Sequence, residues 1–313
     1  MPHDVSRRSF LQNSSLTGVG LGILSPFSDS RKTYQKGASP WPIALNTSTI
    51  RPAPLETKIE AAVAAGYDGI ELWIDDLENY ENEGGNLEAL GKRIRDRGLF
   101  VPNVIGLWGS IPADPAQWEA SLGPTRNRMR IMAAVGSQHA ACIPPGRPAD
   151  IDRKWCADRY RDLVHIGRDE YGISVAFEFI GFIESIHRFG DAAGIAIDAN
   201  IPEACLVMDT FHMYRGGSGF DGLRHIQGDF IAVFHLNDVP AEPPREEMAD
   251  RHRVFPGDGV LPLASVFQQL KKIGYAGALS LELFNEEHYQ QDPMEVAETG
   301  LAKTLEAIQA SGV

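Results

Sequence analysis

The chain has 313 residues, of which 43% are hydrophobic and 23% are charged, and its formal net charge is −13. A chain of this size and composition can bury a sizeable globular core without disulfide or metal staples. The acidic balance argues against a nucleic-acid partner, which requires a basic face, and against an anionic membrane surface, so a small neutral substrate suits it better.

The first residues have the pattern of an export signal. Arg7 and Arg8 are adjacent, Phe10-Leu11 follows shortly after, and residues 16–24 form a short apolar stretch. This pattern is typical of a twin-arginine leader, and the apolar stretch is too short to span a bilayer. We therefore assign residues 1–38 to a leader and residues 39–313 to one domain. The expected location is periplasmic, with no membrane attachment in the mature form. A leader without signal function would leave the protein in the cytoplasm.

From residue 41 short apolar runs alternate with amphipathic segments. Strands are predicted at 42–49, 69–74, 99–108, 137–144, 172–180, 203–209, 230–238 and 277–284. Helices are predicted at 55–67, 86–98, 121–136, 152–171, 184–198, 263–275 and 293–310. The three cysteines, Cys142, Cys156 and Cys205, cannot all pair and match no zinc spacing, so we interpret them as buried core residues.

Eight strands that alternate with helices predict an α/β protein with a (β/α)8 TIM barrel. The strands are near-continuous apolar runs, as expected for parallel strands covered on both faces. The alternative is an open doubly wound sheet, but no G-x-G-x-x-G motif follows the first predicted strand. One long irregular segment, 239–260, is rich in proline and charge, and loops of this length usually serve function or are disordered.

Four consecutive predicted strands each carry one side chain that can bind a metal: Glu178, Asp209, His235 and Glu282. The reactive face of a barrel is the C-terminal end of its strands, so these side chains should meet there. Each residue alone is more often a solvent-facing or hydrogen-bonded core residue. Three carboxylates buried together are very costly without a cation, however. Three carboxylates and one imidazole suit a single divalent ion: Mn²⁺, Co²⁺, Mg²⁺ or Zn²⁺.

Two further residues are expected above the same opening. His212 follows Asp209 by three positions, and Arg253 lies in the long loop just before a Pro-Gly turn. A planar guanidinium there can clamp a substrate oxygen. The alternatives are a helix-capping or solvent-facing histidine and a surface arginine.

Six stretches resemble the xylose isomerase-like barrel superfamily of sugar isomerases and epimerases: GYDGIELW, VAFEFIG, CLVMDTFHMYRGGS, VFHLNDV, DRHRVFPGDGVLPL and LSLELFNEEHY. Within it, the nearest likeness is to the inosose isomerases (2-keto-myo-inositol isomerases), over roughly residues 42–305. The resemblance implies that the four residues on consecutive strands bind one divalent metal and that His212 and Arg253 contact the substrate.

The resemblance also implies a reaction. A keto-sugar or keto-cyclitol would bind the metal, which would stabilise an enediolate as a proton leaves the carbon beside the carbonyl. Glu178 and Glu282 are the candidates for the proton shuttle, and His212 and Arg253 would stabilise the developing oxyanion.

Three alternatives remain open at this point. A lyase of the same barrel family would expel a leaving group after the same proton abstraction, as an inosose dehydratase or a 3-keto-glycoside eliminase does. An endonuclease IV-like DNA repair enzyme is echoed by Asp250-Arg251-His252, but histidines at the ends of earlier strands are missing. A non-catalytic sugar-binding barrel would keep the site as a relic. The oligomeric state is open, a homo-oligomer included.

Overall fold

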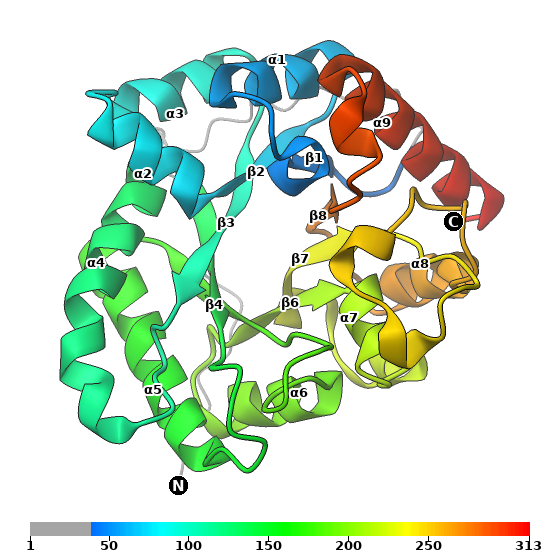
Figure 1. The fold of residues 1–313 in the computed structure, drawn as a ribbon. Helices are drawn as coiled ribbons and strands as arrows, with labels where there is room; N and C mark the ends of the chain where they lie inside the picture. Colours follow the sequence, from blue (N-terminus) through cyan, green and yellow to red (C-terminus); the bar gives the residue numbers. More distant parts are fainter. Residues whose placement is uncertain (1–38) are drawn as a thin grey trace, which may run out of the picture. The chain divides into compact units, whose positions relative to one another are not determined.

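The structure, a computed structural model, describes residues 39–313, so the predicted leader lies outside the described residues. Eight parallel strands close into a barrel in chain order, with β8 paired to β1 (Figure 1). The strands are β1 (Ile43–Asn46), β2 (Gly69–Trp73), β3 (Val101–Trp108), β4 (Ser137–Ile143), β5 (Ser174–Glu178), β6 (Cys205–Asp209), β7 (Ile231–Leu236) and β8 (Ala278–Leu281). All eight predicted strands and the barrel are confirmed, and the open sheet is excluded.

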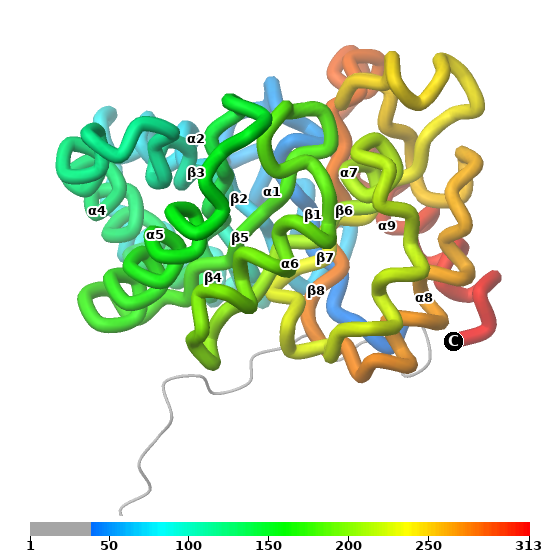
Figure 2. The backbone as a smooth tube through the Cα atoms, turned by 90° about the horizontal axis from the view of Figure 1, so that it is seen from below, coloured from blue at the N-terminus to red at the C-terminus, as the bar shows by residue number. Residues whose placement is uncertain are grey.

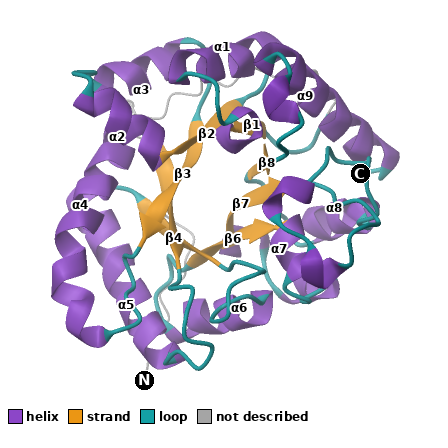
Figure 3. Cartoon of the chain, viewed as in Figure 1, coloured by secondary structure: helices purple, strands orange, loops and turns teal. Residues whose placement is uncertain are grey.

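The helices surround the barrel, as Figure 3 shows by colour. They are α1 (Leu55–Ala65), α2 (Ile74–Asn82), α3 (Leu87–Asp96), α4 (Trp118–Ala134), α5 (Arg153–Ile166), α6 (Phe189–Asp198), α7 (Thr210–Arg215), α8 (Leu263–Lys272) and α9 (Pro293–Ala310). Local signals set several of their ends. Asn86 caps α3 by accepting from the backbone N–H of Ala89, and α1 ends at Gly66, whose φ of 95° favours glycine. None of the helices in the described residues is long and apolar enough to cross a bilayer.

Two helices were not predicted. α2 follows β2 without a loop, and its first turn carries Asp75 and Asp76, which suit the positive end of a helix. α7 begins directly after β6, where Asp209 is its N-cap. Both helices are short, with 9 and 6 residues, and each follows its strand directly, so neither forms a separate periodic segment in the sequence. The helix predicted at 184–198 begins later, at Phe189.

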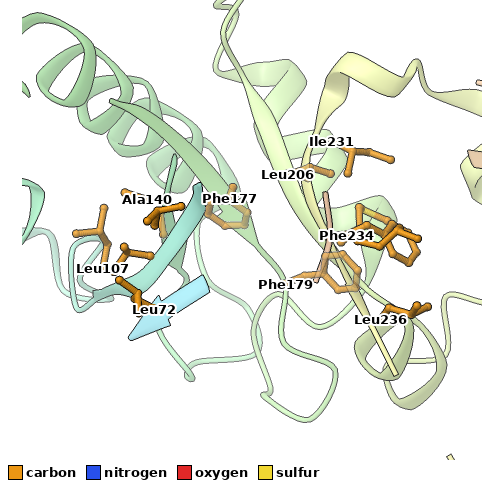
Figure 4. Close-up of a cluster of buried hydrophobic side chains, with 14 of the residues drawn as sticks. Leu72, Leu107, Ala140, Phe177, Phe179, Leu206, Ile231, Phe234 and Leu236 are labelled. Carbon is orange, nitrogen blue, oxygen red and sulfur yellow. The ribbon is translucent and has the colours of Figure 1, made fainter. Parts of the chain in front are cut away.

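Side chains of each strand alternate between two apolar layers, since successive residues of a strand point to opposite faces. In β6, Leu206 and Met208 belong to the cluster shared with the surrounding helices, whereas Cys205 and Val207 belong to a separate cluster inside the barrel. Figure 4 shows part of the outer layer, with Leu206 of β6 beside Ile231 of β7. The inner cluster consists mostly of small side chains: Ala44, Ile105, Ala141, Ala176, Cys205, Val207, Ala232, Val233 and Ala278. All three cysteines are buried, as predicted.

The long 239–260 segment is anchored at its two ends by Asp238. The carboxylate of Asp238 accepts hydrogen bonds from the backbone N–H groups of Val239, Gly257, Gly259 and Leu261, at 2.9–3.2 Å. Figure 2 shows this segment, in yellow, beside α7, and Arg215 of α7 donates to the carbonyl of Met248 at 2.9 Å. The segment is therefore an ordered part of the barrel end that carries the strand C-termini.

Candidate metal centre

The four predicted metal ligands meet inside the barrel at the C-terminal end of the strands. Glu178 and Asp209 are the last residues of β5 and β6. His235 lies in β7, and Glu282 follows the last residue of β8. Nδ1 of His235 is 3.1 Å from Glu282 Oε2 and 3.4 Å from Glu178 Oε1. Oδ2 of Asp209 is 3.8 Å from the same nitrogen. One imidazole nitrogen therefore faces three carboxylates, all of them at most 3% exposed.

This arrangement fits a divalent cation. Nδ1 of His235 is buried and has no hydrogen-bond partner. The other ring nitrogen, Nε2, is 2.9 Å from Oε1 of Glu71, and an ionised carboxylate only accepts, so Nε2 carries a proton. Nδ1 is therefore the ring nitrogen that faces the carboxylate oxygens, and a cation at this point would bind both the nitrogen and the oxygens. Oxygen-rich donors with one nitrogen suit Mn²⁺, Co²⁺, Mg²⁺ or Zn²⁺.

The ligand atoms form two overlapping groups, each with its atoms within 4.8 Å of one another. One group is Asp209, His235 and Glu282, and the other is Glu178, Asp209 and His212. Asp209 belongs to both groups. His212, predicted as a substrate contact, therefore also lies within reach of a bound ion.

Asp209 uses its two oxygens for different purposes. Oδ1 accepts from the backbone N–H groups of Phe211 at 2.6 Å and His212 at 3.2 Å, and so caps α7. The side chain of Asn237 donates to the same oxygen at 3.1 Å. Oδ2 faces the cluster, where Nη1 of Arg253 is 2.7 Å away. The apolar strand β6 ends in an aspartate because this one side chain both starts the next helix and reaches the candidate centre.

Sequence reasoning missed Glu71, a fully buried residue of β2. Its carboxylate accepts from His235 Nε2 and from the side-chain amides of Asn46 at 2.9 Å and Asn103 at 2.7 Å. The hydroxyl of Ser280 also donates to it. A carboxylate that receives a metal-ligating histidine fixes the orientation of the ring. The available signal was a glutamate between apolar neighbours in a predicted strand.

Arg253 is 1% exposed, so the surface-arginine alternative is wrong. Its Nη1 donates to Asp209 Oδ2 and to Glu282 Oε2, both at 2.7 Å. Its Nε and Nη2 donate to Oδ1 of Asp250 at 3.1 and 2.7 Å. The guanidinium thus contacts two of the predicted ligands directly. The sequence predicted the position of Arg253 above the barrel opening but not these contacts.

His212 lies beside this guanidinium. Its Nε2 is 3.4 Å from Nη2 of Arg253 and 3.9 Å from Oδ2 of Asp209, and the side chain is 4% exposed. It neither caps α7 nor faces solvent. Phe211 and Phe284 each lie against the guanidinium of Arg253, with ring centroids 4.6 and 5.0 Å from its central carbon. The aromatic contacts restrict the plane of the guanidinium.

The buried charges interact strongly. Burial raises the pKa of Glu282 to about 7, against the opposing effect of His235 and Arg253. Burial also acts to raise the pKa of Asp209, but the positive charge of Arg253 and neighbouring groups outweighs it and holds the pKa well below its usual range. Burial acts to lower the pKa of His235, but Glu282 and Glu71 hold it well above its usual range. The negative charge of the carboxylates thus favours a positive charge at His235.

The DNA-repair alternative finds no support in the geometry. Of the triplet Asp250-Arg251-His252, only Asp250 is connected to the cluster, because it accepts a hydrogen bond from Arg253. His252 accepts from the backbone N–H of Ala249 at 3.0 Å, and Arg251 is exposed. Within residues 39–313, no histidine from an earlier strand joins either group of ligand atoms.

A sequence model of the Xylose isomerase-like TIM barrel family matches residues 59–308, and the chain belongs to this family. The inosose isomerase of Halalkalibacterium halodurans is 32% identical over 267 residues, which cover 83% of this chain and 94% of that protein. Two other inosose isomerases, from Bacillus licheniformis and Bacillus subtilis, match along 50% of their own length and 45% of this chain. The 3-dehydroshikimate dehydratase of Pseudomonas putida is 24% identical over 80% of this chain and 39% of that protein.

A solved structure with the same fold is the crystal structure of IOLI protein with a binding zinc atom. It superimposes with a TM-score of 0.79 at 23% sequence identity, and the match covers 86% of this chain and 99% of that chain. This likeness supports the barrel architecture described above.

Proposed function

We propose that the protein is a divalent-metal-dependent isomerase or epimerase that acts on a keto-sugar or keto-cyclitol. One observation carries the proposal: Nδ1 of the buried His235 lies within 3.8 Å of oxygens from Glu178, Asp209 and Glu282. The inosose isomerase from Halalkalibacterium halodurans, which aligns with most of this chain, supports the substrate class. The zinc atom named for the IOLI structure supports a divalent ion in this kind of barrel.

The residues of the site have distinct roles in this proposal. Glu178 and Glu282 reach the cluster from β5 and β8, strands that do not pair with each other, so they flank the centre. One carboxylate takes the proton from the carbon beside the carbonyl, and the other returns a proton to complete the rearrangement. The bound ion would act as a Lewis acid toward the carbonyl.

Arg253 and His212 serve the oxygen side of the reaction. The guanidinium already lies 2.7 Å from two carboxylates of the centre and 3.4 Å from His212 Nε2, so it is fixed before substrate arrives. Donors that are positioned in advance stabilise a developing oxyanion without reorganisation. The proposal assigns both residues to the substrate oxygen, which would replace one of the acceptors that the guanidinium now contacts.

A second candidate is a dehydratase or other lyase. The similarity to a 3-dehydroshikimate dehydratase over 80% of this chain favours it. Both reactions begin with removal of a proton beside a carbonyl, so Glu178 and Glu282 serve either one. The two reactions differ in their second step: a lyase expels a leaving group from the β-carbon, whereas an isomerase returns the proton.

Purified protein reconstituted separately with Mn²⁺, Co²⁺, Mg²⁺ or Zn²⁺ and incubated in D₂O with an inosose or a 3-keto-glycoside tests the proposal. Deuterium incorporated at the substrate carbon without loss of a group supports the isomerase. An ultraviolet-absorbing enone or a released aglycone identifies the lyase. The variants Glu178→Gln and Glu282→Gln should lose deuterium exchange. Failure to bind any of these ions stoichiometrically would contradict the proposal and favour the non-catalytic barrel.

A further inference from the structure

The side chain of Asn46, the last residue of β1, is fully buried beside the candidate centre and uses its whole amide group. Its Oδ1 accepts from the backbone N–H of Ser48 and from the indole N–H of Trp73, both at 2.9 Å. Its Nδ2 donates to Glu71 Oε2 at 2.9 Å and to Glu282 Oε1 at 3.1 Å. One amide therefore connects the side chains of Glu71, Glu282 and Trp73.

The orientation of this amide is fixed by its partners. The indole of Trp73 and the backbone N–H of Ser48 only donate, so they require an acceptor, and the carboxylates of Glu71 and Glu282 require a donor. A rotated amide would place two donors against donors and an acceptor against two carboxylates. Because each unmade buried hydrogen bond is costly, the amide stays in one orientation.

This fixed amide decides which oxygen of Glu282 faces the centre. With Oε1 held by Asn46 at 3.1 Å, Oε2 is the atom that lies 3.1 Å from His235 Nδ1 and 2.7 Å from Arg253 Nη1. The same amide holds Glu71, whose other oxygen accepts from His235 Nε2. Asn46 thus holds both Glu71 and Glu282 through its Nδ2. Its own Oδ1 is not a candidate metal ligand, because it accepts from Ser48 and Trp73.

We propose that Asn46 is a positioning residue that makes Glu282 present a single oxygen to the metal and links that carboxylate to Trp73. This inference rests on the proposed metal-dependent function. Trp73 is half-buried and packs against Trp108 and Phe284, with ring centroids 6.1 and 5.7 Å away. A change in the position of Trp73 is therefore passed to Glu282 through one shared amide.

Asn103 offers a matched control. It is also a fully buried asparagine, on β3, and its Nδ2 donates to Glu71 Oε1 at 2.7 Å. Unlike Asn46, it has no hydrogen bond to Glu282. Both Asn46→Ala and Asn103→Ala therefore remove a buried amide that donates to Glu71. Only Asn46→Ala also removes the donor to Oε1 of Glu282.

The test uses Co²⁺ as the probe, because its visible absorption reports the number and geometry of its ligands. Wild-type protein, Asn46→Ala and Asn103→Ala are titrated with Co²⁺, and folding is checked by circular dichroism. We expect Asn46→Ala to weaken Co²⁺ binding by about 10–100-fold, the range typical of residues that support metal ligands. Its bound Co²⁺ should show an altered visible spectrum, while Asn103→Ala, which keeps the hydrogen bond between Asn46 and Glu282, should show a smaller change.

Trp73→Phe supplies a second variant should Asn46→Ala fail to fold. It removes the indole N–H that anchors Oδ1 of Asn46 and leaves every candidate ligand in place, so the spectrum of bound Co²⁺ should change in this variant too. The role of Asn46 would be overturned if Asn46→Ala and Asn103→Ala had the same Co²⁺ affinity and spectrum. If Asn46→Ala does not fold, an unchanged spectrum in Trp73→Phe would overturn it. Neither result would contradict the metal centre. Wild-type protein that binds no Co²⁺ would instead overturn the metal centre itself.

Discussion

Glu71 accepts a hydrogen bond from Nε2 of His235 at 2.9 Å, although the two residues lie on β2 and β7, strands that do not pair. The contact crosses the barrel interior. It fixes the ring so that Nδ1 faces the three carboxylates of the candidate centre. In metal sites, such a carboxylate orients the histidine and raises its basicity as a ligand.

Glu71→Gln should therefore weaken metal binding while the barrel stays folded. The glutamine amide can keep one acceptor for His235, but its NH₂ group then faces the donors Asn46 and Ser280 that now contact Oε2. We expect a loss of about 10–100-fold in Mn²⁺ affinity, measured by isothermal titration calorimetry. Glu170→Gln, which alters an exposed ion pair with Arg126, is the control and should bind as the wild type does. Equal affinity of all three proteins would contradict this role.

Asp209→Asn should separate the two functions of that side chain. Asparagine caps helices as well as aspartate does, so α7 should keep its start. The oxygen that faces the centre loses its charge, however, and the loss in metal affinity should exceed the roughly 10–100-fold typical of supporting residues.

Thermal unfolding measures this difference. A metal at about 100 times its dissociation constant stabilises the wild type by about 2.7 kcal/mol, and chelator should reverse the shift. The variant should melt near the metal-free wild type with or without ion. A melting temperature of Asp209→Asn that rises with the ion as the wild-type value does would remove Asp209 from the ligand set.

The three thiols should be unreactive in the native protein. Burial raises the pKa of Cys142 and of Cys205 to about 12, and that of Cys156 to about 11. Since the thiolate is the nucleophile, almost none is present near pH 8. A disulfide reagent that releases a chromophore should detect no fast-reacting thiol before unfolding and three afterwards. A fast native reaction would show that at least one thiol is accessible.

The leader proposed at residues 1–38 is testable without the barrel. A reporter fused after residues 1–40 should reach the periplasm, because the paired arginines match the twin-arginine pattern. Replacement of Arg7 and Arg8 by lysine is the matched control, since it keeps the charge and removes the pair; the reporter should then stay in the cytoplasm. Cytoplasmic retention of the unaltered fusion would show that this segment does not direct export.

The fold could be predicted because each strand is a compact apolar run between helical segments. The four candidate ligands could be predicted for a related reason: β5 to β8 each place a polar group at the end of such a run. Glu71 and Asn46 carry the same signal on β2 and β1. The alternation of Gly69–Trp73 places Glu71 inside the barrel, but a single glutamate or asparagine in a strand does not by itself indicate which buried groups it contacts.

The contacts of Arg253 could not be predicted. Its position depends on the 239–260 segment, which Asp238 anchors through backbone groups as distant as Leu261. Val254 also pairs with Asp238 in an antiparallel bridge. Such long-range hydrogen bonds leave no periodicity in the sequence, so an arginine in a charged loop could be either exposed or buried. Only the structure shows that its guanidinium reaches Asp209 and Glu282.

The divided carboxylate of Asp209 also links ion occupancy to local order. Oδ1 holds the amide hydrogens of Phe211 and His212, while Oδ2 lies in the ligand cluster. An ion bound at Oδ2 would also restrain Oδ1, because both oxygens belong to the same rigid carboxylate group. The exchange rates of those two amide protons with solvent would thus act as a built-in reporter of loading, readable by NMR before any substrate is known.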